Sequence, residues 1–436
     1  MHLTIAGGAL GWNNLTFNRD GRLLFRYGAA DNGTIVKKAH IYTQEEHGID
    51  PRQVDADAMW VLRGLRKEGF SAYVVGGAVR DMIVGRTPND FDIATDAHPQ
   101  QIRRVFRSAR IIGRRFRIVH VYCGREKYIE VTTFRSRGAI GTAEHSAHPE
   151  QNNFFGTMEE DAERRDFTIN ALYYNPIDKQ VIDYVGGVPD IRQRKLKTLG
   201  VAEDSFAEDP VRMIRAVKYA SLVGFPVPAA MAGLIRKMRE SLLACSRERV
   251  TEEVYKILTS SAAAGIMDLA HKLRLFEVIF PALAEDLRVS RKKFLEHPFA
   301  ARLQELDARA LAGRKLDRND MFGFLFRDLV LARKDLLEGD EPGLPIQQFL
   351  RDVSEPLFPS KKDLGVAVDS LLREARPHDK FPPSGQSRSR GGSAHPHRAP
   401  PAERGGEESA GGPRKRRRRG RGRRRGRGAG AGPAPA

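Results

Sequence analysis

The stretch SAYVVGGAVRDMIVGRTPNDFDIAT, residues 71–95, decides how the first half of this 436-residue chain folds. SAYVV is a short apolar run, and the pair Gly76 and Gly77 that follows it predicts a tight turn. AVRDMIVG indicates a short helix, RTPND a break, and FDIAT a second strand. The order strand, glycine turn, helix, strand indicates an α+β region built on a sheet.

Two aspartates, Asp90 and Asp92, lie at the start of the second strand. Side chains at i and i+2 of a strand share a face, so we expect both carboxylates to point the same way while Phe91 points into the core. Carboxylates and substrate phosphates are ligands that Mg²⁺ prefers, and two such ions can activate a hydroxyl and stabilise a leaving oxygen. Taken alone, the pattern is a weak signal, and two aspartates in a polar, solvated loop explain it better than a metal site does.

The glycine pair adds a second signal, because Gly77 lies thirteen residues before Asp90, where a strand ends and a helix begins. Glycines at such a junction let the backbone approach a phosphate, whose charge the helix N-terminus and Arg80 can complement. An ordinary tight turn explains the glycines by themselves. Combined with the strand-borne Asp-x-Asp, they indicate a nucleotidyl transfer site.

A third acidic group has two candidates in the sequence. Glu130 lies in KYIEVTTF, a predicted strand whose Ile129 and Val131 face the other side. Asp166 lies beside Arg165 in RRDFTINALYY, where a positive charge keeps a carboxylate ionised, although an Arg–Asp pair is also a common structural ion pair. The spacing does not choose between Glu130 and Asp166.

The rest of the chain predicts a succession of regions. Residues 1–45 are rich in Gly and Asn and form an extension with no assigned role, and residues 46–200 form an α+β catalytic head. Amphipathic segments such as EDPVRMIRAVKYASLVGF indicate an all-α remainder, with a neck over residues 201–265 and a body over residues 266–380. Residues 381–436 have the composition of a disordered Arg-rich tail.

The chain carries a net charge of +18, which indicates a polyanionic partner such as nucleic acid. Residues 381–436 hold +12 of this charge, and eleven of the fourteen residues 414–427 are Lys or Arg. Two cysteines, Cys123 and Cys245, are too few for a disulfide framework or a Cys-ligated zinc site. With no basic signal-peptide segment and no apolar run long enough to span a membrane, we expect a cytoplasmic protein without a membrane partner.

A family pattern is carried by four motifs in order, GGAVRDMIVGRTPNDFD, IIGRRFRIVHV, RRDFTINALYY and EDPVRMIRAVKYA. Together they resemble the class II branch of the polymerase-beta-type nucleotidyltransferases, which holds tRNA CCA-adding enzymes and bacterial poly(A) polymerases. The resemblance is dense over residues 70–225 and looser to residue 375. It implies a polymerase-beta-like nucleotidyltransferase head on a mixed sheet, followed by an all-α neck and body.

The resemblance also implies roles for individual residues. Asp90 and Asp92 match the metal-binding catalytic pair, and Asp166 matches the third catalytic carboxylate assigned in the poly(A) polymerases. The residues that match nucleotide-binding positions are Gly76, Gly77, Arg80, Arg165, Asp209, Arg212 and Arg215. The implied cofactors are two Mg²⁺ ions, with ATP as the substrate and RNA 3′ ends as the partner.

Asp209, Arg212 and Arg215 fall three residues apart, which on a helix places them on one face. A carboxylate acceptor and a guanidinium donor so spaced can read a base edge by hydrogen bonds, as a complementary strand would. A surface ion pair explains the spacing alone, but within the family pattern we expect nucleotide selection. The family's next arginine is Lys218 here, which keeps the charge and loses the bidentate fork.

IIGRRFRIVHV is similar to the signature that separates bacterial poly(A) polymerases from CCA-adding enzymes, and Gly113, Arg114 and Arg115 in it form a predicted basic turn able to contact a phosphate. A basic tail suits an enzyme that holds many unrelated RNA 3′ ends, because counterion release gives sequence-independent affinity. We therefore expect a template-independent adenylyltransferase that adds AMP from ATP to RNA 3′ ends. The alternatives are a CCA-adding enzyme and a non-catalytic RNA-binding protein, and the tail is a candidate docking segment for RNA-processing proteins.

Overall fold

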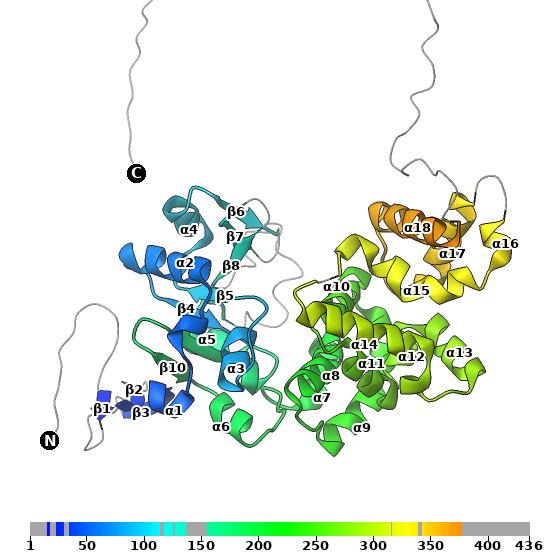
Figure 1. Cartoon of the computed structure of the whole chain (residues 1–436). Coiled ribbons are helices and arrows are strands. Elements are labelled where there is room, and N and C mark those ends of the chain that lie inside the picture. The colour runs from blue at the N-terminus through cyan, green and yellow to red at the C-terminus, as the bar shows by residue number, and fades with distance from the viewer. Residues whose placement is uncertain are drawn as a thin grey trace, which may run out of the picture. The chain divides into compact units, whose positions relative to one another are not determined.

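The computed structural model (Figure 1) describes residues 15–17, 23–29, 35–113, 117–124, 127–136, 155–314, 316–338 and 342–376. Its strands are β1 (Leu15–Phe17), β2 (Leu23–Ala29), β3 (Ile35–Tyr42), β4 (Ala72–Val75), β5 (Asp92–Thr95), β6 (Ala109–Ile112), β7 (Ile118–Tyr122), β8 (Tyr128–Thr133), β9 (Leu172–Asn175) and β10 (Gln180–Asp183). The predicted order of strand, glycine turn, helix and strand is confirmed by β4, by α3 (Gly77–Ile83) and by β5.

Within the described residues these strands form one sheet, in the order β1-β2-β3-β10-β9-β4-β5-β8-β7-β6. The sheet is mixed, as predicted, because β5 pairs with β8 in parallel while β4 pairs with β5 and β7 with β8 antiparallel. Its register places Asp92 opposite Glu130, Glu130 opposite His120, and His120 opposite Arg110. A single row of side chains therefore crosses four strands on one face.

Short helices surround the sheet. They are α1 (Gln44–His47), η1 (Pro51–Gln53), α2 (Ala56–Lys67), α4 (Pro99–Val105), α5 (Met158–Glu163), η3 (Thr168–Asn170) and α6 (Gly187–Arg192). The apolar stripe of α2 is buried, and the Asp55 carboxylate caps the helix by accepting hydrogen bonds from the Asp57 and Ala58 N–H groups. Helices α2 and α4 contact β5, β6, β7 and β8, on the side that Ile93, Val119 and Val131 face.

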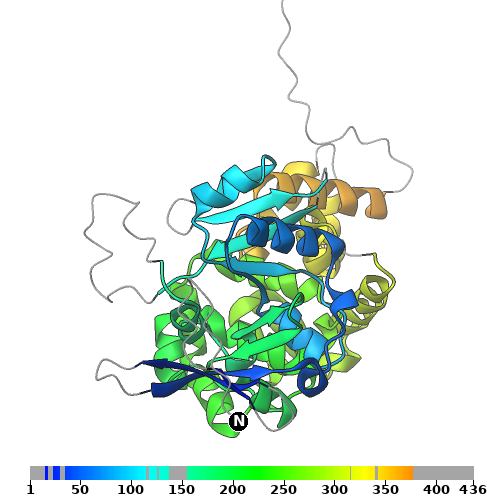
Figure 2. The ribbon, with the colours of Figure 1, turned by 90° about the vertical axis from the view of Figure 1, so that its left-hand side faces the viewer.

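Part of the segment 1–45 is in the sheet, which the sequence did not predict. Figure 2 shows β1, β2 and β3 as dark blue strands at its lower edge. Strand β3 pairs antiparallel with β10, with Ile41 opposite Ile182, and both of these side chains are buried. The sequence did not predict these strands because their local pattern is weak. Strand β3 is stabilised by pairing with a strand some 140 residues later, and no local pattern indicates that contact.

After residue 200 every named element of the described chain is helical, as predicted. These elements are α7 (Ala202–Glu208), α8 (Val211–Val223), α9 (Ala229–Met238), η4 (Arg239–Ala244), α10 (Arg247–Leu258), α11 (Ala263–Lys272), α12 (Phe276–Ile279), α13 (Pro281–Ser290), η5 (Phe294–Glu296), α14 (Pro298–Leu311), η6 (Arg318–Asp320), α15 (Met321–Leu331), α16 (Lys334–Leu337), α17 (Gly343–Ser354) and α18 (Lys361–Ala375).

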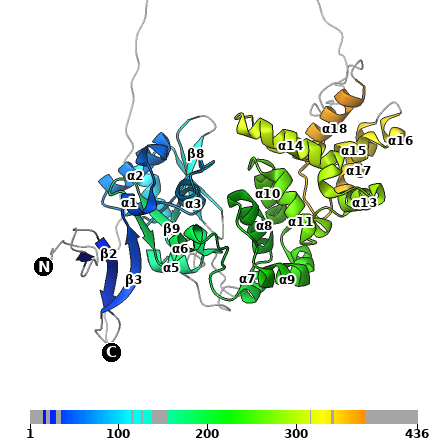
Figure 3. The same cartoon turned by 60° about the horizontal axis from the view of Figure 1, so that its bottom comes forward.

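Helices α8 and α10 contact each other and carry the polar residues that concern the site (Figure 3). Among the described residues, no helix combines the length and the apolar character that crossing a membrane requires. The predicted Arg-rich tail, residues 381–436, lies outside the described residues.

Candidate active site

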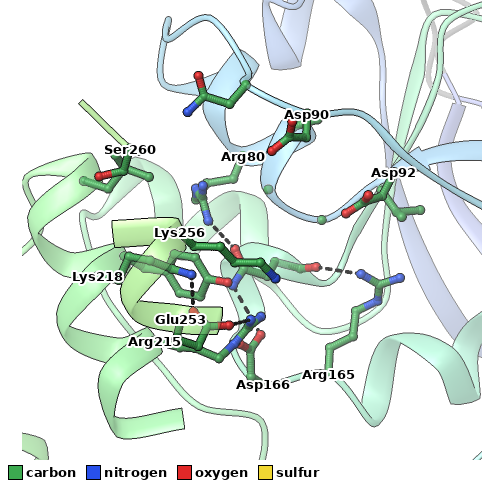
Figure 4. A pocket seen from close by; sticks show the side chains of 18 of the residues that line it. Arg80, Asp90, Asp92, Arg165, Asp166, Arg215, Lys218, Glu253, Lys256 and Ser260 are labelled. Atoms are coloured by element: carbon green, nitrogen blue, oxygen red, sulfur yellow. Dashed lines mark hydrogen bonds and ion pairs between the residues drawn. The ribbon is translucent and has the colours of Figure 1, made fainter. Parts of the chain in front are cut away.

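A cavity of about 650 Å³ lies between the sheet and helices α8 and α10 (Figure 4). Its lining includes all ten residues that the sequence proposed for the site, namely Gly76, Gly77, Arg80, Asp90, Asp92, Arg165, Asp166, Asp209, Arg212 and Arg215. These residues come from segments up to 139 positions apart in the chain, so the fold brings three of the four motifs to one place, and IIGRRFRIVHV contributes no residue to the lining.

The two aspartates of β5 are placed slightly differently from the prediction. The strand begins at Asp92, and Asp90 lies in the loop just before it, yet both carboxylates line the cavity. Strand β8 adds Glu130 directly opposite Asp92. Withdrawal from bulk water, together with the negative charges of Glu130 and Asp90, raises the pKa of Asp92 to about 7. The cavity thus concentrates negative charge at this wall, which the charges of Arg165 and Lys256 offset only in part.

These carboxylates fit a hard cation by their chemistry. Magnesium is bound in nucleotide-handling sites by one or two carboxylates that substrate phosphates complete, and not by a full protein cage. In the part of the chain that the structure describes, no three His, Cys, Asp or Glu side chains form such a cage. An all-oxygen pair, Asp90 and Asp92, with Glu130 beside it, agrees with a site that the substrate completes.

Asp166 is held in a different way. Its Oδ1 accepts hydrogen bonds from the Phe167 N–H (2.9 Å) and from Asn170 Nδ2 (3.2 Å), and its Oδ2 accepts one from Arg215 Nε (2.6 Å). Although burial raises the pKa of a carboxyl, Arg215 and these hydrogen bonds hold that of Asp166 below its usual value. Asp166 is engaged in an ion pair, whereas the carboxylate that the register sets beside Asp92 is Glu130, so the geometry favours Glu130 as the third acidic group.

A buried charge network extends from Asp166 into α10. Arg215 Nη1 donates to Glu253 Oε1 (2.9 Å), and Glu253 Oε2 pairs with Lys218 (Figure 4). Burial raises the pKa of Glu253, but the charges of Lys218, Arg215 and Lys256 outweigh it and lower that pKa to about 2. Burial lowers the pKa of Lys218 to about 8.

Sequence reasoning missed Glu253, although one signal could have found it. Glu253 occupies a position on the apolar stripe of α10, together with Val250, Val254 and Ile257, and all four are buried. A glutamate on a helix stripe that packs inward needs a cationic partner, because an unpaired buried charge is costly. The partner itself is not local, since Arg215 lies 38 residues earlier.

The glycine turn and the arginines fit together closely. Gly76 has φ +71, and a Cβ built there would lie 3.3 Å from Arg165 Nη1, so both the backbone and the space require glycine. Arg165 Nη2 donates to Asp161 (3.0 Å), and its Nη1 donates to the Asn170 carbonyl (3.3 Å). Arg80 is buried and donates from Nη1 to the Asn170 side chain (2.6 Å). The structure therefore fixes both guanidinium groups beside the turn.

The neck residues depart from the expected single helical face. Asp209 lies between α7 and α8, outside either helix, and its Oδ2 accepts a hydrogen bond from Arg249 Nη2 (2.7 Å). Arg212 is in α8 and donates to Glu208 (2.8 Å), whereas Arg215 points to Asp166. The residue before Pro210 is disfavoured in a helix, which explains why the three-residue spacing does not become a helical repeat.

Lys256 of α10 was also not predicted. Figure 4 shows its side chain extending into the cavity between the Asp90 and Asp92 side and the Glu253 side. Across the described ranges its ammonium has no ion-pair partner within 4 Å, so it is available to an anionic ligand. Two further cations proposed for phosphate contact, Arg114 and Arg115, lie outside the described residues.

Comparison with known proteins connects the fold and the cavity to named families. The chain matches the family model described as "Poly A polymerase head domain" over residues 72–197, and one described as "Probable RNA and SrmB- binding site of polymerase A" over residues 224–287. Poly(A) polymerase I of Salmonella typhi is 35% identical over 293 residues, 66% of this chain and 63% of that protein. The matched region thus spans less than two thirds of that relative's length.

CCA-adding enzymes are similar as well. The CCA-adding enzyme of Geobacillus kaustophilus is 35% identical over 324 residues, which are 72% of this chain and 76% of that protein. A crystal structure of the Bacillus stearothermophilus CCA-adding enzyme in complex with CTP is 29% identical, with 74% of this chain and 82% of that chain covered and a TM-score of 0.48.

Proposed function

Because the chain belongs to the tRNA nucleotidyltransferase/poly(A) polymerase family, we propose that it is a template-independent polynucleotide adenylyltransferase. It transfers AMP from ATP to the 3′-hydroxyl of RNA and releases pyrophosphate. The observation that carries this proposal is the cavity in which Asp90 and Asp92 lie across from Arg165 and Lys256, with Glu130 opposite Asp92 in the sheet. Carboxylates on one side and cations on the other are what metal-assisted transfer from a triphosphate requires.

Asp90 and Asp92, supported by Glu130, hold two Mg²⁺ ions in this proposal. When bound, the ions would lower the pKa of the RNA 3′-hydroxyl and neutralise part of the negative charge of the triphosphate. Arg165 and Lys256 bind phosphate oxygens from the other side of the cavity. Asp161 and Asn170 already fix the Arg165 guanidinium, so little reorganisation is needed when the nucleotide arrives.

Base selection falls to the junction of α7 and α8. Asp209 offers a carboxylate acceptor and Arg212 a guanidinium donor at the same wall of the cavity. Arg249 and the Val211 N–H donate to the Asp209 carboxylate, and Arg212 Nη1 donates to Glu208 and Ser205. In this proposal, the other lone pairs of Asp209 and the other N–H groups of Arg212 meet the edge of a base, which selects a nucleotide without a template.

The choice of ATP over CTP is supported by two observations. The IIGRRFRIVHV stretch is similar to the poly(A) polymerase signature, and the tail of residues 381–436 carries +12. A polycation binds RNA without regard to sequence, which suits a substrate set of many unrelated 3′ ends.

CCA addition to tRNA is the second candidate, because the Geobacillus kaustophilus CCA-adding enzyme matches over a larger share of both chains. One assay separates the two candidates. The purified chain receives each labelled nucleoside triphosphate in turn, with either an unstructured RNA or a tRNA lacking its terminal CCA. We expect incorporation of AMP on both RNAs, whereas CMP incorporation restricted to the tRNA would establish CCA addition. The absence of any Mg²⁺-dependent incorporation would point to an RNA-binding protein without catalysis.

The metal assignment has a matched test on the same strand. We expect Asp92→Asn to lower AMP incorporation by at least about 1000-fold while RNA affinity changes less than about twofold, since the lost carboxylate serves the reaction and not RNA binding. Asp96→Asn, just beyond the other end of β5, keeps the acceptor for the Ser71 N–H and serves as control. Incorporation by Asp92→Asn at the rate of Asp96→Asn would refute the assignment.

A further inference from the structure

An aromatic cluster lies on the exposed face of β7 and β8. Tyr128, at the start of β8, is 46% exposed. The His120 ring is stacked parallel to it, with the ring centroids 4.0 Å apart and the planes inclined by 9°. Tyr122 lies beside both rings, at 5.8 Å from Tyr128, and the Arg110 guanidinium lies 5.2 Å from the Tyr122 ring centre. We call Tyr128, His120 and Tyr122 the aromatic platform.

The packing of the sheet does not account for this platform. Helices α2 and α4 cover the opposite face, where Val119, Val121 and Ile129 are buried. The alternation along β7 and β8 turns the platform residues away from that core. Tyr128 is about half exposed, while His120 and Tyr122 are partly buried beneath and beside it. An exposed aromatic ring supported by stacked rings is a common surface for binding.

The platform is continuous with the carboxylates of the cavity. Asp92, Glu130, His120 and Arg110 form one row across four strands, because each is opposite the next in the register. Tyr128 lies two residues before Glu130 on the same face, roughly 7 Å away along the strand. Burial and the negative charges of Glu130 and Asp90 raise the pKa of Tyr128, which agrees with this proximity.

We propose that the aromatic platform stacks an unpaired base at the 3′ end of the RNA, so that the terminal ribose lies near Asp90 and Asp92. This inference rests on the proposed function, which requires an RNA 3′-hydroxyl at these carboxylates. Aromatic rings beside an arginine are what single-stranded nucleic acid prefers, because bases stack on the rings while the cation meets the backbone. The negative charges of Glu130 and Asp90 repel a phosphate placed directly over Tyr128. An uncharged base is therefore the part of the nucleotide that fits against this ring.

The incoming nucleotide is a less suitable occupant. Its base is assigned to Asp209 and Arg212 on the helical wall, whereas the platform continues the sheet on the outer side of Glu130. The strand order β5-β8-β7-β6 leads from the carboxylates of β5 and β8 outward to the edge of the sheet. An RNA strand whose end is at Asp92 has its preceding nucleotides along this direction.

The test compares Tyr128→Ala, Tyr128→Phe and Trp60→Ala in the full-length chain. Trp60 is 49% exposed on α2 and is the matched control, because it is an equally open aromatic residue on the other side of the sheet. The probe is a fluorescent unstructured RNA, titrated at several salt concentrations. We expect Tyr128→Ala to weaken binding about 5- to 100-fold, as loss of one stacked base does, with the salt slope unchanged. Tyr128→Phe and Trp60→Ala should bind like the parent chain.

A second arm places an abasic nucleotide at each of the last three positions of the RNA in turn. One of these RNAs should bind the parent chain as weakly as Tyr128→Ala binds the intact RNA, and should lose nothing further with Tyr128→Ala. Equal affinities of Tyr128→Ala and Trp60→Ala for intact RNA, or additive losses at every abasic position, would overturn the platform. Binding is measured without ATP, so the platform stands or falls separately from the adenylyltransferase proposal, which the nucleotide assay tests.

Discussion

Glu130 and Asp166 are both carboxylates that line the cavity, and their surroundings suit them to different tasks. Glu130 lies opposite Asp92 in the sheet, its side chain is 37% exposed, and burial raises its pKa. Both carboxylate oxygens of Asp166 accept hydrogen bonds, which come from Arg215, Asn170 and the Phe167 N–H. Glu130 contacts only the His120 ring, at 3.9 Å, among the ion pairs of the described residues, and a carboxylate so placed next to two others can meet a cation. A carboxylate with satisfied lone pairs stabilises its neighbours instead.

From this contrast we expect two isosteric substitutions to have different effects, one on turnover and the other on the free energy of unfolding. Glu130→Gln should lower the turnover of AMP incorporation by about 100-fold with little change in the free energy of unfolding. Asp166→Asn should lower the free energy of unfolding by about 2 to 3 kcal/mol, because the partly buried Arg215 loses one of its two counter-charges. Steady-state kinetics and urea unfolding of both variants measure the split. Normal stability of Asp166→Asn together with loss of turnover would restore Asp166 as the third catalytic carboxylate.

At the level of single residues, the sequence predicted what local spacing can show. Gly76, Asp90 and Asp92 were recognised because a strand, a turn and a strand follow one another within 25 residues. Glu130 could not be preferred over Asp166, because the parallel pairing of β5 with β8 spans a helix and two other strands of the chain. Registers between distant strands depend on packing of the whole sheet, which no short motif records.

One face of helix α10, in the predicted neck, lines the cavity. Arg249, Glu253 and Lys256 recur at helical spacing, and each does a separate task there. Arg249 holds the Asp209 carboxylate, Glu253 holds Arg215 and Lys218, and Lys256 extends into the cavity. A displacement of this helix would therefore change the base-reading wall and the Asp166 ion pair together.

Glu253 allows a test of this element by pH. Its folded pKa of about 2 lies below the ordinary value of 4.5, so its stabilisation is present above pH 4.5 and is lost as the pH falls towards 2. Glu253→Gln should lower the free energy of unfolding by about 3 kcal/mol at pH 7, and this difference should shrink steadily below pH 4.5. Denaturant unfolding across this pH range is the measurement.

Glu252→Gln is the matched control for the pH experiment. Glu252 is the preceding residue of α10, and its ion pair with Arg318 is at the surface, with half of the Arg318 side chain exposed. Such pairs contribute less than about 1 kcal/mol. A difference between Glu253→Gln and the parent chain that stays constant from pH 7 to pH 3 would contradict the charge network as its source.

The elements of the fold were predictable to different degrees. Strands β4 to β8 and helix α2 follow from local patterns, because each has an apolar face with the correct period. Strands β9 and β10 carry LYYN and QVID, runs too short to be distinguished from the surrounding loops. Strands β1, β2 and β3 depend on the pairing of β3 with β10, which lies far along the chain. The sequence of residues 1–45 alone therefore did not predict them.

On the scale of the whole molecule, the charge of +18 divides into two parts with different tasks. The first 380 residues carry only +6, and several cations that line the cavity are fixed by named partners, as Arg165 is by Asp161 and Arg215 by Asp166. Residues 381–436, which lie outside the described residues, carry +12. Fixed cations can discriminate one nucleotide from another, whereas a polycation gives affinity without discrimination.

Removal of residues 381–436 tests this division. The shortened chain should bind unstructured RNA at least about 10-fold more weakly at low salt and with a shallower dependence of log Kd on log salt, because fewer counterions are released. Its preference for ATP over CTP should stay unchanged, since Asp209 and Arg212 remain in the described fold. A full-length chain in which the Lys and Arg residues of 414–427 are replaced by Gln is the control for tail length, and it should behave like the truncation. A changed nucleotide preference in either variant would show that the tail acts at the cavity, and the division of charge would then be wrong.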